Sequence, residues 1–170
     1  GTKKKSKPLP AIDRAEAPFH LPAGWAWARF PEVGAFGRGK SKHRPRNDPS
    51  LYAGGKTPFV QTGDVARSGG KITTHSATYN DKGLAQSQLW PKGTMCITIT
   101  GILQFDACFP DSVVGLIPAS MFENARYFEY FVRTAKSDLT AFAPATAQKN
   151  INLGILEMVL IPLPPLAEQH

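Results

Sequence analysis

The sequence lacks the long apolar runs, the cysteine content and the charge density that mark several familiar protein classes. No stretch approaches the roughly 18 consecutive apolar residues of a membrane-spanning helix, so we do not expect a membrane protein. Two cysteines, Cys96 and Cys108, cannot build a disulfide scaffold and favour reduced thiols in a cytoplasmic protein, with a single bridge left open. The basic start has no apolar stretch behind it, which argues against a secretory signal.

Catalytic and metal-binding patterns are missing as well. The four histidines are scattered, and neither cysteine has a second ligand at the spacing of a zinc site. No nucleophile-elbow pattern and no glycine-rich dinucleotide fingerprint after a strand is found. Asp64 lies in a Thr-Gly-Asp turn, where a carboxylate caps a turn more often than it acts as a catalytic acid. We therefore expect no catalytic centre, no metal and no bound cofactor.

The apolar content suffices for one core with many turns. Hydrophobic residues make up 42% of the 170 residues, which suits one domain or one domain with a linker. Met95, Ile97 and Ile99 alternate with Cys96 and threonines, which predicts a strand over 94–103. Further short strands are predicted at 26–30, 59–61, 72–74 and 155–160, and in one or two places within 105–116. Repeated Gly and Pro predict a long, functional loop over 34–55.

One longer helix is predicted to begin at Ser120. Ser120 and Glu123 have the spacing of a capping box. An apolar face follows at spacings of three or four, formed by Phe122, Ala125, Phe128, Val132 and Ala135. The aromatic residues of this segment, Tyr127, Phe128, Tyr130 and Phe131, are interpreted as core rather than as base-stacking side chains.

The excess of positive charge is confined to two short segments. The net charge is +7, while residues 47–170 are close to neutral. Residues 1–18 form a basic, proline-containing linker. Residues 37–46 carry Arg38, Lys40, Lys42, Arg44 and Arg46 without an acid. Clustered Lys and Arg attract phosphates, so this segment favours a polyanionic partner over a loop that is basic only for solubility.

Residues 34–41 also match the pattern of a phosphate-binding loop, Gly-x-x-x-x-Gly-Lys-Ser. That loop depends on a helix that follows the lysine and aims its amides at the phosphates. Here Pro45 and Pro49 follow within eight residues of the motif, which disfavours such a helix. A nucleotide-binding protein is therefore kept only as an unfavoured hypothesis.

Several segments together resemble one family. They are residues 21–27, 37–44, Pro-Phe-Val-Gln-Thr-Gly-Asp-Val at 58–65, 90–94, 148–151 and Ile-Pro-Leu-Pro-Pro-Leu-Ala-Glu-Gln at 161–169. In this order they resemble a target recognition domain of the specificity subunit of type I restriction-modification systems. The resemblance implies an α/β (α+β) fold with a twisted, mostly antiparallel sheet and few helices, without the family's spacer helices.

The resemblance also implies a function and partners. Such a domain reads one half of a split double-stranded DNA target and is not itself an enzyme. Methyltransferase subunits and translocase-nuclease (restriction) subunits join the whole specificity subunit, and the methyl donor, ATP and magnesium are expected on those partners. The implied division is a linker after a spacer helix at 1–18, the recognition domain at 19–163 and the start of a truncated spacer helix at 164–170.

Candidate DNA contacts follow from side-chain chemistry. Phosphate contacts set register, whereas contacts to base edges give sequence. The phosphate candidates are Lys40, Lys42, Lys56 and Lys149. The base candidates are Arg38, Arg44 and Arg46, which suit guanine, Gln61, which suits adenine, and the weaker Thr62 and Tyr79.

The residues are also compatible with two different functions. One is the recognition part of a single-chain restriction-methylation enzyme, which would carry a methyl-donor site in a separate catalytic half. The second is a protein-interaction module in which the basic segment binds an acidic partner. Such a module would show no selectivity between DNA sequences at any salt concentration.

Overall fold

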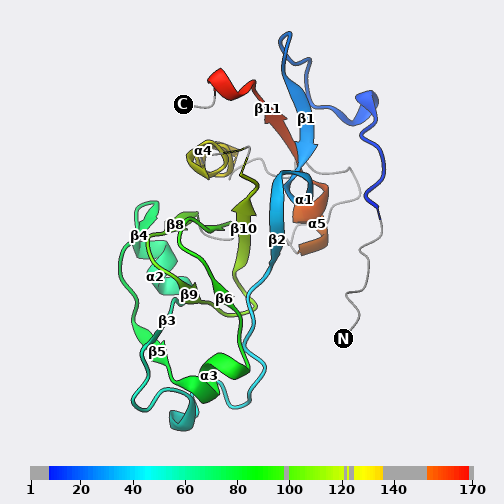
Figure 1. Cartoon of the computed structure of the whole chain (residues 1–170). Coiled ribbons are helices and arrows are strands. Elements are labelled where there is room, and N and C mark those ends of the chain that lie inside the picture. Colours follow the sequence, from blue (N-terminus) through cyan, green and yellow to red (C-terminus); the bar gives the residue numbers. More distant parts are fainter. Residues whose placement is uncertain (1–7, 98–99, 121, 123–124, 136–152, 169–170) are drawn as a thin grey trace.

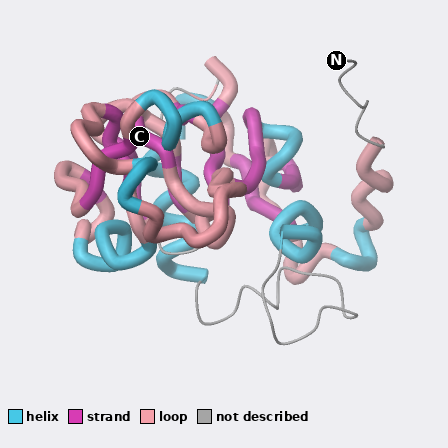
Figure 2. Tube along the Cα trace, turned by 90° about the horizontal axis from the view of Figure 1, so that it is seen from below, coloured by secondary structure: helices cyan, strands magenta, loops and turns pink. Residues whose placement is uncertain are grey.

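Short strands joined by long loops dominate the computed structural model, which describes residues 8–97, 100–120, 122, 125–135 and 153–168 (Figures 1 and 2). A two-stranded ribbon lies at one end, a four-stranded sheet at the other, and a five-stranded sheet between them (Figure 1). The N-terminal segment runs along one side of the molecule in both views. The mixed fold with mostly antiparallel pairing confirms the predicted fold class.

The two-stranded ribbon pairs a strand near the N-terminal end of the described residues with a strand near their C-terminal end. Strand β1 (Ala26–Arg29) pairs antiparallel with β11 (Leu160–Leu163). Trp25 Nε1 donates to Glu168 Oε2 at 3.1 Å, which ties the final 3₁₀ turn, η4 (Leu166–Glu168), to the start of β1. An N-terminal 3₁₀ turn, η1 (Arg14–Glu16), precedes the ribbon.

The five-stranded sheet has the order β2-β10-β7-β8-β4. Its strands are β2 (Gly34–Arg38), β4 (Lys71–Ile72), β7 (Met95–Cys96), β8 (Gly101–Leu103) and β10 (Val114–Pro118). Only β4 and β8 pair in parallel among the described strands of this sheet. The four-stranded sheet has the order β5-β3-β9-β6, from β3 (Thr57–Phe59), β5 (Ala77–Tyr79), β6 (Leu89–Trp90) and β9 (Ala107–Cys108).

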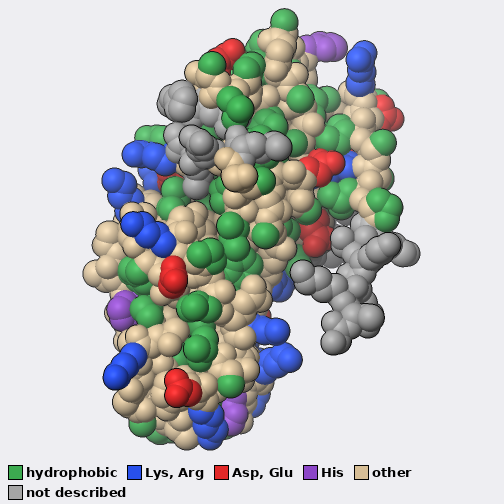
Figure 3. Space-filling view, viewed as in Figure 1, with side chains coloured by type: hydrophobic (Ala, Val, Ile, Leu, Met, Phe, Trp, Pro, Cys, Tyr) green, Lys and Arg blue, Asp and Glu red, His purple; other side chains and the backbone are tan. Residues whose placement is uncertain are grey.

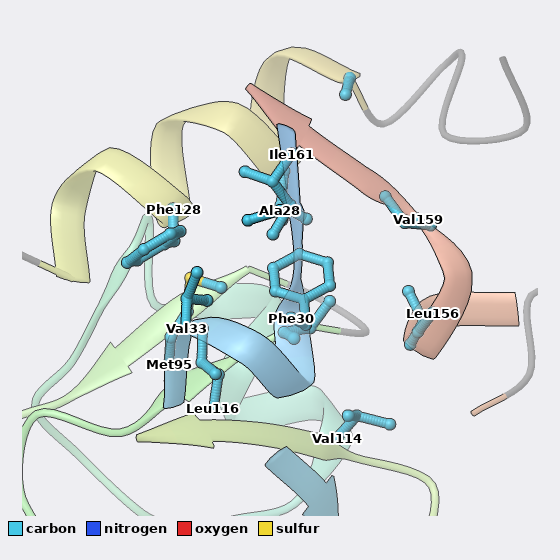
Figure 4. Close-up of a cluster of buried hydrophobic side chains, with 13 residues drawn as sticks. Ala28, Phe30, Val33, Met95, Val114, Leu116, Phe128, Leu156, Val159 and Ile161 are labelled. Atoms are coloured by element: carbon cyan, nitrogen blue, oxygen red, sulfur yellow. The ribbon is translucent and has the colours of Figure 1, made fainter. Parts of the chain in front are cut away.

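The helices are short and border the sheets. They are α1 (Phe30–Val33), α2 (Thr62–Arg67), α3 (Asp81–Ala85), α4 (Ala125–Ala135) and α5 (Leu153–Met158), with a 3₁₀ turn η2 (Pro49–Leu51). The main core cluster lies where α4, α1, α5 and the ribbon meet the five-stranded sheet (Figure 4). Phe128 of α4, Phe30 of α1 and Met95 of β7 are fully buried in this cluster.

Two predicted strands are wrong in detail. The segment 94–103 is a hairpin, because Met95 pairs with Ile102 and Cys96 pairs with Gly101 across it. Alternation along a strand and alternation along both arms of a tight hairpin give the same sequence pattern. The segment 155–160 is mostly helix α5, with the strand β11 beginning only at Leu160. A short apolar run does not distinguish a buried strand from a buried helix by its period.

The predicted helix start and the predicted long loop also need correction. Helix α4 is described from Ala125, and Ser120 lies in a turn in which Phe122 N bonds Ala119 O at 2.8 Å. Glu123 of the predicted capping box lies outside the described residues. Residues 34–38 form β2, which pairs with β10 along its full length. A Cβ at Gly34 would overlap the carbonyl oxygen of Ile117, so this glycine permits close pairing rather than breaking the strand.

Most of the aromatic helix face is core, as predicted, and both cysteines are free thiols. Cys96 and Cys108 are buried and free, and burial raises the pKa of Cys96 to about 12. Phe128 is fully buried and Tyr127 is partly buried, so these rings pack inward. Tyr130 differs, because 51% of it is exposed on the outer side of α4.

Asp64 acts as a cap, as its position in the turn predicts. Its carboxylate accepts hydrogen bonds from Gln61 N at 2.9 Å and from Ser76 Oγ at 2.8 Å, and pairs with Arg67 at 2.9 Å. Burial alone would raise the pKa of Asp64, but the bonds from Gln61 and Ser76 and the charge of Arg67 lower it below its usual value. The carboxylate thus fixes the start of α2 against the segment before β5.

Asp64→Asn should lower the free energy of unfolding at pH 7 by about 1–3 kcal/mol, because charge-assisted hydrogen bonds are weakened in a buried place. A lowered native pKa stabilises the fold above the ordinary carboxyl pKa, and this contribution is lost as the pH falls through the native value. The deficit of the variant should therefore shrink below about pH 4. Urea denaturation at several pH values measures this stability deficit, with a substitution of the exposed Asp81, Asp81→Asn, as control. A deficit that does not change with pH would contradict the role of Asp64 as an ionised cap.

Candidate nucleic-acid interface

The basic segment after β2 forms a loop whose entry is fixed by backbone packing. Gly39 N donates to Val113 O at 2.9 Å and Lys40 N donates to Phe109 O at 3.0 Å. A Cβ at Gly39 would overlap the carbonyl oxygens of Phe109 and Pro110, so only glycine fits this approach. The loop therefore leaves the sheet in one direction, beside residues 109–113.

Polar side chains of other segments then hold the backbone of the loop. Gln86 Oε1 accepts hydrogen bonds from Lys42 N at 2.7 Å and from His43 N at 3.0 Å. Ser87 Oγ donates to Lys40 O at 2.6 Å. These contacts come from the end of α3 and the residue after it, so the fold shapes the loop from outside.

A second set of contacts closes the far side of the loop. His43 Nε2 lies 2.7 Å from Asp48 Oδ2, and Asp48 Oδ1 accepts from Ser50 N at the start of η2. The hydrogen bonds from Ser50, aided by His43, lower the pKa of Asp48 to about 2. Asp48 is therefore ionised at neutral pH, and Tyr52 Oη donates to Arg46 O at 2.6 Å just beyond it.

The three arginines predicted to read bases all donate to the protein. Arg38 Nη1 bonds the backbone oxygen of Asp111 at 2.8 Å, and Arg46 Nη2 bonds the Asp111 carboxylate at 2.7 Å. Arg44 Nη1 bonds Ser41 O at 2.7 Å and His43 O at 2.8 Å. Each guanidinium carries further N–H groups, so these bonds orient the side chains and leave donors for a ligand.

A hollow of about 460 Å³ lies between this loop, the start of α2 and residues 110–112. It is lined by Ser41, Arg46, Asn47, Tyr52, Phe59, Gln61, Thr62, Gly63, Pro110 and Ser112. Three of the sequence-predicted residues, Arg46, Gln61 and Thr62, thus meet at one place. Asn47 and Ser112 were missed, because nothing in the sequence shows that 110–112 approaches the loop. We call this feature the loop hollow.

The predicted phosphate-contacting lysines surround the loop but do not enter the hollow. Lys40, Lys42 and Lys56 are exposed, and their side chains have no hydrogen bond or ion pair within the described residues. Lys and Arg side chains are visible beside the loop that follows β2 and, separately, over α4 and β4 (Figure 3). Lys149 lies outside the described residues.

Tyr79 is a core residue, which corrects its prediction as a base contact. It has no exposed surface, and its ring stacks on Phe59 with centroids 4.2 Å apart. Its hydroxyl lies 3.5 Å from Ser41 Oγ. Tyr79 therefore supports the loop from beneath and has no face available for a base.

The phosphate-loop hypothesis fails on geometry. Residues Gly34–Arg38 of the motif form the sheet strand β2, and the chain after Ser41 continues as loop rather than helix. The amide of Lys40 already donates to Phe109 O and so is not available to cradle a phosphate. In the described residues, no three His, Cys, Asp or Glu side chains gather as metal ligands, and no helix is long and apolar enough to cross a membrane.

Gln86→Ala should release the loop without unfolding the protein. Loss of the shared acceptor should speed hydrogen exchange at the Lys42 and His43 amides, because both lose their hydrogen bond. Amide exchange measured by NMR checks this, with the exposed neighbour Gln88→Ala as the matched control. Unchanged protection of both amides in Gln86→Ala would show that the loop does not depend on this contact.

Comparison with solved structures shows where this fold occurs. The chain is similar to the HsdS subunit from Thermoanaerobacter tengcongensis, with 23% identity and a TM-score of 0.67 over 89% of this chain. It is also similar, at 21% identity and a TM-score of 0.65, to a chain from a structure on complex assembly and conformational transition of the type I R-M system. A third match is the type I restriction-modification S subunit from M. genitalium, at 13% identity and a TM-score of 0.51 over 86% of this chain.

These matches concern part of each solved chain. The chain covers 36%, 37% and 36% of the three, so it spans little more than a third of their length. At these identities the likeness establishes the fold. The family model described as type I restriction modification DNA specificity domain matches residues 22–170, nearly the whole chain. The chain therefore belongs to the type I restriction modification DNA specificity domain family.

Proposed function

We propose that the chain recognises a specific double-stranded DNA sequence, as one half of the split target of a type I specificity subunit. The observation that carries this proposal is the loop hollow, where Arg46, Gln61 and Thr62 meet beside an outward-facing basic loop. The hollow offers guanidinium, amide and hydroxyl groups, which are the groups that read base edges. Specificity domains of this family are non-catalytic, so no reaction is assigned to the chain.

Phosphate contacts are assigned to the lysines around the hollow. Lys40, Lys42 and Lys56 are exposed and extend from the loop and from the start of β3. Phosphate contacts of this kind fix the register of a protein on DNA without reading sequence. Lys149 is proposed for the same role on its chemistry alone.

Base contacts are assigned to side chains that line the loop hollow or lie beside it. Arg46 is the strongest candidate, because its bond to Asp111 leaves a second edge of the guanidinium for the two acceptors of guanine. Gln61 suits adenine, and Thr62 suits either base pair. Arg38 and Arg44 are held nearby through backbone oxygens and are proposed as secondary contacts.

Assembly with other subunits belongs to the same proposal. Methyltransferase and restriction subunits would join the whole specificity subunit in the cytoplasm. The methyl donor, ATP and magnesium would bind to those partner subunits. The boundaries 1–18, 19–163 and 164–170 for linker, recognition domain and spacer-helix start are proposed on the same basis. The recognition part of a single-chain enzyme is not favoured, because the matched structures come from type I systems.

Domain exchange tests the proposal directly. Residues 19–163 replace one recognition domain in a specificity subunit of the family, which is expressed with its methyltransferase in an unmethylated host. Genome sequencing for modified bases should then show a split motif in which one half has changed and the other is retained. A motif that ignores the exchange would mean that the domain does not read sequence, and an interaction module would take its place.

Two loop variants should separate the roles within the site. Arg46→Ala should cost about 1–3 kcal/mol on the selected DNA half-site and little on scrambled DNA, because it removes a base contact. Lys42→Ala should weaken binding to both duplexes equally and flatten the salt dependence, because it removes a phosphate contact. Fluorescence anisotropy with labelled duplexes measures the affinity of each variant for each duplex and its dependence on salt. Equal losses on both duplexes from both variants would contradict this division.

A further inference from the structure

A second basic hollow lies outside the site described above. It has a volume of about 510 Å³ and lies between α4, the turn at 68–70 and the strands β4 and β8. Its charged lining consists of Lys71, Arg126, Glu129 and Arg133. We call it the α4 groove, and it coincides with the basic side chains seen over α4 and β4 in Figure 3.

An exposed tyrosine between two arginines forms much of one wall of the groove. Tyr130 is 51% exposed, although it lies in an aromatic run that is otherwise directed inward. The guanidinium carbons of Arg126 and Arg133 lie 5.8 Å and 5.9 Å from the centre of its ring. Cation–π contact at this distance holds both charges beside the ring.

The acid of the groove is already neutralised. The Glu129 side chain is only 5% exposed and is paired with Arg133 one helical turn away. Arg133 also contacts Gly69 O, and a Cβ at Gly70 would collide with its guanidinium. Arg133 is therefore fixed in place, and Lys71 and Arg126 are exposed in the same groove, which carries three basic side chains and one acidic one.

The two hollows lie at opposite ends of the same short helix. Gln61, Thr62 and Gly63 at the start of α2 line the loop hollow, and residues 68–70 just beyond its end line the α4 groove. A helix of six residues is about 9 Å long. The phosphates of one DNA strand follow one another at about 3.4 Å along the helix axis, so this length corresponds to about three base pairs. The two hollows are therefore separated by much less than the length of a DNA half-site.

We propose that the α4 groove is a second contact surface for the sugar-phosphate backbone of the same DNA duplex. Lys71 and Arg126 contact phosphates, while Glu129 and Tyr130 position the arginines. Contacts of lysine and arginine to phosphates carry no sequence information, so the contribution of the groove is independent of sequence. This inference rests on the proposed function, since it needs DNA at the loop hollow.

The test uses Lys71→Gln, Arg126→Gln and the double variant of the 170-residue chain. Anisotropy is measured with the selected half-site and with scrambled DNA between about 50 and 200 mM salt. Each single variant should weaken binding to both duplexes by the same factor. The ratio of wild-type to variant affinity should fall about three- to fourfold across this salt range for each phosphate contact removed. Arg126→Lys keeps the charge and should keep the wild-type salt dependence.

A variant of Glu129 should change the affinity for DNA in the opposite direction. Glu129→Gln keeps the size of the side chain and an acceptor for Arg133 but removes the negative charge, so it should tighten binding to both duplexes. A purely structural role would predict loss instead. Arg14→Gln, an exposed arginine of η1, is the charge-matched control that should leave the salt dependence close to wild type. Thermal unfolding confirms that each variant is folded.

The outcomes separate this inference from the proposed function. If the wild-type chain selects a sequence but the double variant matches Arg14→Gln in affinity and salt dependence, the groove inference fails alone. If the same two substitutions in the specificity subunit used for the domain exchange instead abolish assembly with the methyltransferase, the groove belongs to a protein interface and the inference is overturned. If the wild-type chain shows no sequence selection at any salt concentration, the proposed function fails.

Discussion

The close approach of Gly39 to the backbone of Phe109 and Pro110 is the contact on which the candidate site depends. This contact ends the pairing of β2 with β10 and directs the basic loop past residues 110–112, which complete the hollow. Phe109 in turn stacks on Trp90 within the core, at 4.9 Å between ring centres. The position of the loop is thereby linked to buried aromatic packing.

The electrostatics of the loop follow the same arrangement. Like charges at 38, 40, 42, 44 and 46 repel one another, and their repulsion would expand a free loop. Asp111 and Asp48 reduce this repulsion through Arg46 and His43, while Gln86 fixes the backbone between them. Ordering the loop before a ligand arrives lowers the conformational entropy that binding must remove. The remaining exposed lysines keep the positive potential that attracts DNA.

The sequence predicted which types of side chain form the candidate site better than it predicted how the fold brings them together. Lysines and arginines at 38–46 pointed to phosphate chemistry because charge is local in sequence, and Asp64 was identifiable as a cap because capping is local as well. Tyr79 could not be placed, since only the pairing of β5 with β3 shows that its ring is buried on Phe59. Ser112 reaches the hollow through the fold alone. The glycines at 34 and 39 resembled loop signals because a glycine needed for close packing and one needed for a turn look identical in sequence.

The separation of supporting residues from contacting residues explains how one fold could serve different targets. The loop backbone is held by Gln86 and Ser87, neither of which lines the hollow, and by Tyr52, which does. The side chains that line it, such as Asn47 and Gln61, lie on segments whose course is fixed by hydrogen bonds of the backbone and by the Asp64 cap. Replacement of an exposed lining side chain, such as Asn47 or Gln61, therefore alters the hydrogen-bonding groups offered to a base and leaves the core unchanged, whereas Phe59 of the lining is itself part of the core. A recognition surface built in this way can change its target by few substitutions, because its exposed side chains are not the ones that hold the core.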